Sequence, residues 1–258
     1  MTLRLPGCLI PRDQASPSAA RPWPAAALAA LVIVGGALTG CGDSGSAKSA
    51  ASPTSAAAAV QKAGAYTYTT NGADRVEAII SGRHDYPKVT TVSVTRNGCD
   101  LTERWDALPE RWSESTSCIV GARWRLVSLV DYHEFFGESL QQRYDCRGRF
   151  VPRPAVIRAG YRWNDRCRAP GSTATLEGTA LGTKTLEVGG KRVQTVLLRL
   201  RAQLRGRIRG TNVIDSWLLR STGLLVRRAV RTDTVVESSV GTVKGREQYS
   251  LELRSLAP

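Results

Sequence analysis

A strict two-residue alternation between residues 196 and 210 limits what this chain can form. Its even positions are apolar or small, and from residue 199 onward its odd positions carry Arg or Gln. Side chains alternate faces along a β-strand, so this run predicts one long strand with an apolar face and a cationic face. We expect Gly206 and Gly210 to bend or bulge that strand. The cationic face holds five candidates for contact with an anion: Arg199, Arg201, Arg205, Arg207 and Arg209.

Two interpretations of these arginines are open. Because Arg forms paired hydrogen bonds with phosphate and carboxylate oxygens, the row is suited to contact anionic lipid headgroups or an acidic wall polymer. In the alternative, the row is a solvated outer face. Neighbouring strands would then neutralise its charges, and Asp215 and Glu252 are candidate partners.

Shorter alternations of the same period recur after residue 64, where helical periodicity is weak. They include Tyr66 with Tyr68, then residues 90–94, 124–130 and 249–253. We therefore predict a mostly β fold of antiparallel curved sheets, arranged either as two similar halves or as a half-open barrel. The Ala-rich residues 54–63 predict a short N-terminal helix.

Turn signals separate the predicted strands. Asn71-Gly72 and Asn97-Gly98 have the composition of two-residue hairpin turns. Ser221-Thr222-Gly223 lies between two apolar runs and predicts a further hairpin. We expect the chain to reverse at each of these places.

The first 40 residues are typical of an export signal. Arginines precede an apolar stretch from Ala25 to Ala37, which leads to Leu38-Thr39-Gly40-Cys41. These last four residues resemble the lipobox of bacterial lipoproteins. The resemblance implies cleavage before Cys41 and acylation of its sulfur, which would anchor the chain to the outer face of the cell membrane. A spanning helix would need about 20 apolar residues, and this stretch is shorter.

Composition divides the rest of the chain. Residues 41–58 begin with the lipidated Cys and continue with Ser, Ala, Gly and Pro, which predicts a tether. Residues 59–258 are long enough for one sizeable core and predict a β-rich extracytoplasmic domain. An internal repeat of about residues 60–168 and 169–258 is also suggested. Its landmarks are Trp105, Gly137 and Tyr144 in the first half, and Trp217, Gly241 and Tyr249 in the second.

Four cysteines remain beyond the predicted signal and lipid site: Cys99, Cys118, Cys146 and Cys167. An even number in an exported domain predicts two disulfides. Of the three possible connectivities, we favour Cys99–Cys118 and Cys146–Cys167, because each pair encloses a short local loop. No Cys-x-x-Cys pair or suitably spaced His accompanies them, so we expect no metal site.

The net charge of +14 favours anionic partners. Outside the cell, these partners would be anionic lipid or a cell-wall polymer, and we expect no nucleic acid. In the alternative, the abundance of Arg reflects a GC-rich genome and not selection for binding. The positive charge alone therefore predicts a class of partner and no particular one.

No pattern indicates an enzyme or a cofactor. The two histidines, His84 and His133, lie in no nucleophile motif, and Glu134 with Glu138 would make an isolated acid–base pair. Glycine-rich phosphate loops are also missing from the sequence. The tryptophans could line a ligand groove, but ordinary core packing is the commoner role of Trp in a sheet protein.

Several short stretches together resemble a group of uncharacterised actinobacterial lipoproteins. They are residues 64–68, 83–87, 98–99, 104–108, 135–137 and 144–146. The resemblance spans most of residues 60–256 and implies no activity. In architecture alone, the chain is also similar to LolA-like lipid-carrying lipoproteins, which implies a half-open barrel with an apolar cavity.

Two function classes follow from these observations. The first is a membrane-anchored extracytoplasmic protein that binds an amphiphile or an anionic envelope component. The alternative is a structural or accessory envelope module without a small-molecule site. A curved apolar face with a cationic rim favours the first class, whereas well-filled sheets without a cavity would favour the second.

Overall fold

A computed structural model describes residues 59–258, except 78–80, 136 and 239–240, and all of these residues belong to one compact unit. Cys41 and the whole of the predicted tether, residues 41–58, lie outside them. The described residues form fourteen strands in one antiparallel sheet. They are β1 (Gly64–Glu77), β2 (Ser81–Asp85), β3 (Val89–Asn97), β4 (Asp100–Leu108), β5 (Arg111–Val120), β6 (Arg123–Phe135), β7 (Glu138–Cys146), β8 (Val151–Pro152), β9 (Arg162–Ala169), β10 (Ser172–Val188), β11 (Lys191–Gly206), β12 (Ile208–Leu219), β13 (Leu225–Ser238) and β14 (Gly241–Leu253).

Twelve of these strands close into a barrel. Apart from β8, which the path passes over from β7 to β9, neighbours in sequence pair one after another from β3 to β14, and β1 joins the two ends because it pairs with both β3 and β14. β2 adds to the side of β1, and β8 pairs with β6. The mostly β, antiparallel prediction is thus confirmed, and the barrel is closed rather than half-open.

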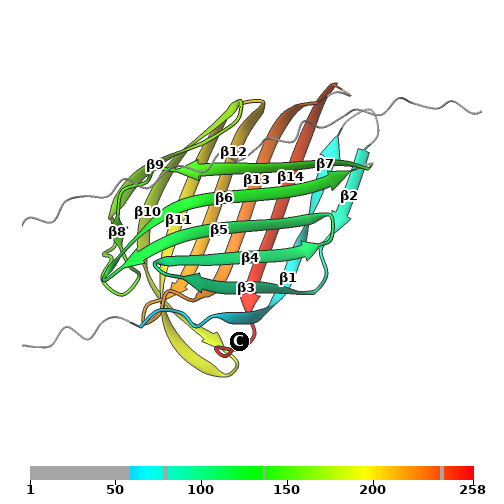
Figure 1. The fold of residues 1–258 in the computed structure, drawn as a ribbon. Helices are drawn as coiled ribbons and strands as arrows, with labels where there is room; N and C mark the ends of the chain where they lie inside the picture. The colour runs from blue at the N-terminus through cyan, green and yellow to red at the C-terminus, as the bar shows by residue number, and fades with distance from the viewer. Residues whose placement is uncertain (1–58, 78–80, 136, 239–240) are drawn as a thin grey trace, which may run out of the picture. The chain divides into compact units, whose positions relative to one another are not determined.

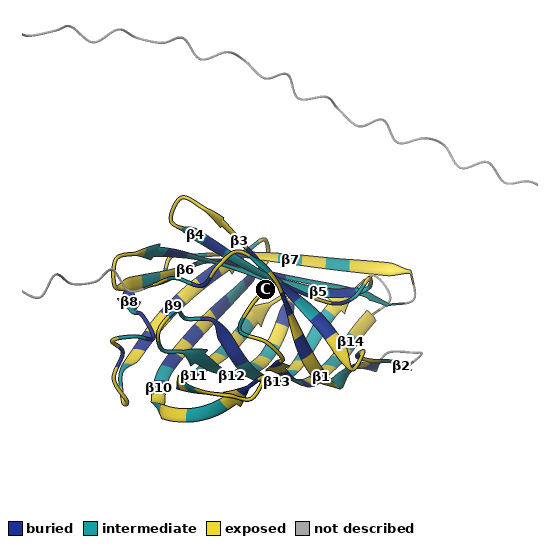
Figure 2. Cartoon of the chain, turned by 90° about the horizontal axis from the view of Figure 1, so that it is seen from below, coloured by how far each residue is buried: buried dark blue, intermediate teal, exposed yellow. Residues whose placement is uncertain are grey.

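The barrel has two layers whose strands cross steeply. Figure 1 shows β3–β7 running across the front of β10–β14, and Figure 2 shows buried positions interspersed with exposed ones along strands of both layers. The largest core cluster lies between them and contains Trp105 of β4, stacked on Tyr249 of β14 at a centroid distance of 4.2 Å. Strand alternation produces this core directly, because one residue in two points inward.

The turn signals had different outcomes. Asn97-Gly98 forms the β3–β4 hairpin with Gly98 at φ 59°, and Ser221-Thr222-Gly223 joins β12 to β13, as predicted. Asn71-Gly72 makes no turn, since β1 continues through both residues to Glu77. A Cβ atom on Gly72 would overlap with Tyr249 of the adjacent strand. Glycine therefore allows β1 and β14 to approach each other closely at this position.

The predicted single strand over residues 196–210 is wrong at its C-terminal end. β11 ends at Gly206, where φ is 107°, and the chain turns back so that Gly210 of β12 pairs with Leu204 of β11. Glycine therefore permits a reversal where we expected a bend. The two-faced pattern itself is confirmed within β11, where Val196 and Leu198 are buried and Arg201 and Arg205 are exposed.

The predicted N-terminal helix is also not supported. Residues 59–63 are irregular and then enter β1, while residues 54–58 lie outside the described part of the chain. Val60 packs against the main core cluster, and Gln61 N–H donates to the carbonyl of Thr222 at 3.2 Å. These tertiary contacts replace the local helix that alanine-rich composition favours. None of the described residues forms a helix able to cross a bilayer.

Two disulfides join Cys99 to Cys118 and Cys146 to Cys167, which is the pairing that loop length favoured. The second bond lies at the weakest junction of the barrel. Within the described residues, β7 and β9 pair only at Asp145↔Arg168 and Cys146↔Cys167. The rest of β7 has β6 on one side and a free edge on the other. We call this junction the β7–β9 seam.

The internal repeat stays a prediction. Six strands, β1 and β3–β7, precede the seam, and the six strands β9–β14 follow it. Gly137 and Tyr144 accompany the last strand of the first set, as Gly241 and Tyr249 do in the second. The third pair of landmarks does not correspond in this way, because β4 and β12 hold different places in their sets.

Candidate binding site

A cavity of about 260 Å³ lies between the two layers of the barrel. This volume is slightly below the range of about 300–1,000 Å³ that is typical of small-molecule sites. Its walls are mainly apolar because the inward positions of the strands are apolar. Representative wall residues are Leu126 and Leu129 of β6, Leu198 and Leu200 of β11, and Ile214 and Leu218 of β12.

Several residues that line this apolar cavity also carry a buried side-chain polar atom without a hydrogen-bond partner in the described protein. These atoms are Gln61 Oε1, Trp124 Nε1, Asp165 Oδ1, Asn212 Oδ1 and Arg228 Nε. A buried polar group left unpaired costs about 1–3 kcal/mol. Such groups in native proteins are normally satisfied by water, an ion or a ligand. The cavity therefore combines an apolar wall with fixed polar contact points.

Asp165 is the one carboxylic acid in this group of residues. Burial raises the pKa of its carboxyl above the ordinary value, and Arg149 opposes that rise. A carboxyl shifted in this direction is more readily protonated, and a protonated carboxyl can donate a hydrogen bond as well as accept one. In its protonated form, Asp165 is thus suited to donate a hydrogen bond to an oxygen atom of a ligand.

A buried ion pair crosses the cavity between the layers. Arg111 at the start of β5 donates from Nε and Nη2 to the two carboxylate oxygens of Glu247 on β14, at 2.9 and 3.1 Å. The hydroxyl of Tyr86 donates to the same carboxylate. The side chains of Arg111 and Glu247 are only 3% and 6% exposed.

The two charges hold each other ionised. Burial alone would lower the pKa of Arg111, but Glu247 raises it well above its ordinary value. Burial would likewise raise the pKa of Glu247, yet Arg111 brings it below the ordinary value. Burial, and then the Glu247 charge, raise the pKa of Tyr86 and keep its hydroxyl protonated. The network is therefore a fixed polar group at one end of an apolar space.

Both histidines converge on one buried carboxylate beside this network. Nδ1 of His84 lies 3.3 Å from Oδ1 of Asp74, and Nδ1 of His133 lies 3.7 Å from Oδ2. Asp74 is itself the cross-strand neighbour of Glu247. The three residues come from β1, β2 and β6, so they connect both layers. We predicted only that the two histidines lie in no nucleophile motif, and this cluster was not expected.

The predicted anion-contact arginines do not act as one row. Arg199 forms two 2.7 Å hydrogen bonds with Asp215, one of the two candidate partners. Arg209 lies beyond the reversal on β12 and bonds to Glu237 at 2.6 Å. The other candidate partner, Glu252, bonds to Arg227 instead. The structure gives no ion pair, among the residues that it describes, for the remaining three: Arg201, Arg205 and Arg207.

The tryptophans divide between the inside and the outside of the barrel. Trp105, Trp124 and Trp163 line the cavity, so they serve both core packing and its wall. Trp112 stacks on Tyr132 with a centroid distance of 5.4 Å and contacts Arg104 through its ring face. The aromatic residues therefore include cavity-wall members, but they form no continuous stacking platform.

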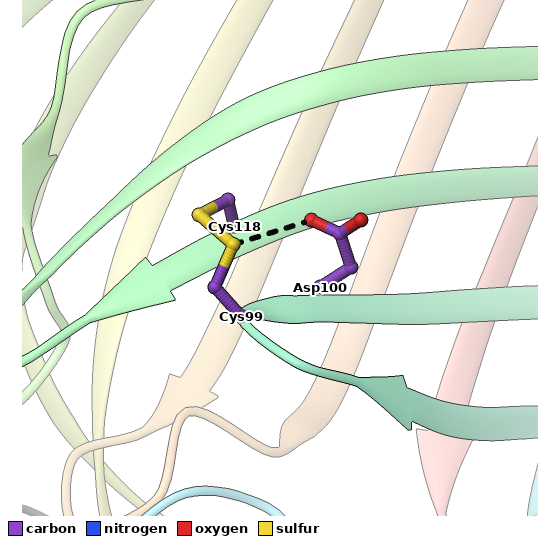
Figure 3. A group of neighbouring side chains, drawn as sticks. All are labelled: Cys99, Asp100 and Cys118. Atoms are coloured by element: carbon purple, nitrogen blue, oxygen red, sulfur yellow. Dashed lines mark hydrogen bonds between the residues drawn. A yellow bond between two sulfur atoms is a disulfide. The ribbon is translucent and has the colours of Figure 1, made fainter. Parts of the chain in front are cut away.

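One group has the residue types of a metal site, but its chemistry differs. Ligand atoms of Cys99, Asp100 and Cys118 lie within 4.8 Å of one another. Figure 3 shows the two sulfurs bonded to each other and the Asp100 carboxylate 3.5 Å from the Cys99 sulfur. A disulfide sulfur cannot act as a thiolate ligand, so we assign this group a structural role.

Sequence reasoning missed the buried charges although their strand positions point inward. Glu247 shares its face with Tyr249, Leu251 and Leu253, and all four are buried. Asp74 follows Tyr66, Tyr68 and Thr70 at the same spacing of two. Extending each alternation by a few residues would have placed both carboxylates inside.

Comparisons with known proteins add little to this geometry. No family model matches the chain, and no curated protein is significantly similar to it. Among solved structures, the chain is similar to the hypothetical lipoprotein YmcC from Escherichia coli (K12). The sequence identity is 12%, the TM-score is 0.34, and the match covers 74% of this chain and 87% of that chain. A likeness this weak carries no conclusion about function. The actinobacterial and LolA-like resemblances stay predictions.

Proposed function

We propose that this chain is a lipid-anchored protein of the cell envelope whose barrel binds an amphiphile between its two layers. The main support is the cavity, where an apolar wall suits a hydrocarbon chain and unpartnered polar atoms suit a head group. Ligand sites typically have this composition, with a few polar groups set in an apolar pocket. The proposed role is binding without catalysis.

The location outside the cytoplasm is part of the same proposal. Two disulfides suit an oxidising compartment. The lipobox-like residues 38–41 would supply a lipid anchor at Cys41, so the membrane would be the first partner of the protein. An amphiphile carrier in this position would exchange its ligand with the membrane or the cell wall. The alternative, an envelope module without a small-molecule site, is favoured if no ligand enters the cavity.

The first experiment asks whether the protein carries a ligand. The Cys41→Ser chain, exported and purified without detergent, is analysed by native mass spectrometry and titrated with a fluorescent fatty-acyl probe. We expect a co-purifying lipid mass or saturable probe binding. A bare protein mass together with no probe uptake would overturn the proposal.

A pair of substitutions locates the bound probe. Leu200 lines the cavity, whereas Leu197 lies on the other face of the same strand. Leu200→Trp should fill part of the cavity and weaken probe binding about tenfold or more, because the acyl chain loses its space. Leu197→Trp adds the same bulk outside and should leave the affinity unchanged. Equal effects of the two substitutions would mean that the probe binds elsewhere.

A further inference from the structure

The outer surface of the layer formed by β1 and β11–β14 has a second hollow, of about 920 Å³. Its centre is lined by small side chains, including Ala73, Val213 and Ala229. Longer cationic side chains surround them: Arg83, Lys88, Arg199, Arg201 and Arg231. We call this hollow the outer basin. At β12 it lies on the opposite face of the sheet from the cavity between the layers, because Val213 alternates with the cavity-lining residues Asn212 and Ile214, although Val230 and Tyr249 line both hollows.

Two of the five cations in the outer basin are neutralised by neighbouring acids. Arg199 binds Asp215 through both carboxylate oxygens, and Arg83 binds Asp85. Across the described chain, no acid lies within ion-pair distance of the other three cations, which are Lys88, Arg201 and Arg231. The outer basin therefore has three cations without an ion pair among the described residues, and the nearest acids by register and charge are Glu177, opposite Arg201 on β10, and Asp85, which feels the charge of Lys88.

The strand register brings two of these free cations toward one point. Val213 of β12 is the cross-strand partner of both Arg201 on β11 and Arg231 on β13. The two arginines are therefore two strands apart on one face, with about 10 Å between their Cα atoms. Both side chains are long enough to reach a group that sits above the small side chain of Val213. Like charges on one sheet face repel each other, and an anion between them would remove that repulsion.

We propose that the outer basin binds a phosphate-bearing anion. A phosphate monoester carries about −1.5 to −2 charges and three acceptor oxygens, which suits several cations arriving from different strands. The planar fork of Arg binds two phosphate oxygens at once. A carboxylate supplies one charge and two oxygens, and Asp85 and Asp215 already show how a single Arg satisfies such a group. Three free cations around one hollow fit the larger anion better.

The test measures binding of glycerol 3-phosphate to the Cys41→Ser chain by calorimetry at constant ionic strength. The Arg201→Gln/Arg231→Gln variant removes two charges from the outer basin. The Arg205→Gln/Arg207→Gln variant removes two exposed charges that do not line it. All four side chains are exposed, so both variants should fold, and the thermal unfolding midpoint checks this. We expect about a tenfold or greater loss of affinity in the first variant and less than about a twofold change in the second.

Two outcomes would overturn the proposal: no saturable binding by the parent chain, or equal losses in both variants, which would indicate general attraction by net charge. A second arm replaces the probe with vesicles that contain phosphatidylglycerol. Vesicle binding that depends on Arg201 and Arg231 would identify lipid headgroups as the source of the phosphate. Binding of glycerol 3-phosphate alone would identify soluble or polymeric phosphate esters. Amphiphile uptake by the inner cavity is measured separately, so either proposal can fail without the other.

Discussion

The guanidinium of Arg111 and the carboxylate of Glu247 bind each other through two hydrogen bonds that connect the two layers of the barrel. Both side chains are almost fully buried. Removing one partner of a buried ion pair leaves the other charge unpaired in a medium of low polarity. This pair therefore gives a sharp test of the packing between the layers.

Replacing Glu247 with Gln should destabilise the protein by about 3 kcal/mol, because Arg111 keeps its charge, loses its buried acid and retains only the longer 3.4 Å contact with the half-exposed Asp131. The free energy of unfolding in urea measures the change. Glu252→Gln is the matched control on the same strand, since Glu252 forms an exposed ion pair with Arg227. That control should cost about 0–1 kcal/mol. Similar losses for the two variants would contradict the role given to the buried pair.

The same carboxylate predicts how stability responds to acid. The folded-state pKa of Glu247 is below its ordinary value, chiefly because Arg111 outweighs the effect of burial. Its stabilisation is therefore fully present above the unfolded pKa of about 4.3 and is lost as pH falls through the lower, folded pKa. Unfolding midpoints measured from pH 7 to pH 3 should fall less steeply for Glu247→Gln. Parallel curves for the variant and the parent would refute this assignment.

Asp165 predicts the opposite dependence. Burial raises the pKa of its carboxyl, so the folded protein binds the proton more tightly than the unfolded chain does. Its ionisation disfavours folding, and stability from this group is lost as pH rises through the folded pKa. Asp165→Asn should raise the unfolding midpoint at pH 7 and make little difference below pH of about 3.9, where both states are protonated. A lower midpoint for the variant at pH 7 would show that the ionised form is stabilised instead.

The two disulfides should differ in what they hold together. Cys146–Cys167 joins strands that have only two residue pairs within the described chain, whereas Cys99–Cys118 lies between the well-paired strands β4 and β5. Each bond closes a loop of similar length and should contribute about 3 kcal/mol to global stability. Hydrogen exchange separates local from global effects. Cys146→Ser/Cys167→Ser should increase exchange in β7 and β9 well before global unfolding, and Cys99→Ser/Cys118→Ser should not.

Gly178 lies under the indole ring of Trp163, its cross-strand partner on β9. A Cβ atom at position 178 would overlap with that ring, so the side chain would have to leave the cavity wall. Gly178→Ala should cost about 1–3 kcal/mol through overpacking and should shift the tryptophan emission. Thr175→Ala, at an exposed position on β10, is the control and should change neither quantity. Unchanged emission in the glycine variant would show that Trp163 is positioned differently.

Local patterns in the sequence predicted the strands well because alternation acts within a few residues. The faces of β11, the turn at Gly98 and the two disulfides all follow from near neighbours in the chain. The reversal at Gly206 was missed because the alternation of apolar and polar residues continues unbroken past it. The end of β11 and the start of β12 therefore have the sequence pattern of a single strand. The register between distant strands decided that outcome, and no local signal encodes it.

The buried ionic residues were missed for a different reason. Charged side chains are rarely buried unless they are paired, and Asp74, Arg111 and Glu247 were not among the residues predicted for the core or a site. Their partners are far apart in the sequence, and only the closed barrel brings them together. The free cations of the outer basin show the same limit. Arg231 on β13 and Lys88, just before β3, line the same hollow as Arg199 and Arg201 of β11 only because the closed sheet brings these distant segments together.

The pairing of β1 with β14 sets the order of events during synthesis. Its ladder runs from Tyr68↔Leu253 to Glu77↔Lys244. The first long strand to be synthesised therefore cannot complete its pairing until the last strand has been synthesised. Contacts of such sequence separation make folding slow, and the unpaired edges of β1 and β13 stay open to other chains meanwhile. A chaperone that shields β1, or a C-terminal truncation that removes β14, should therefore govern how much of this protein reaches its native state instead of aggregating.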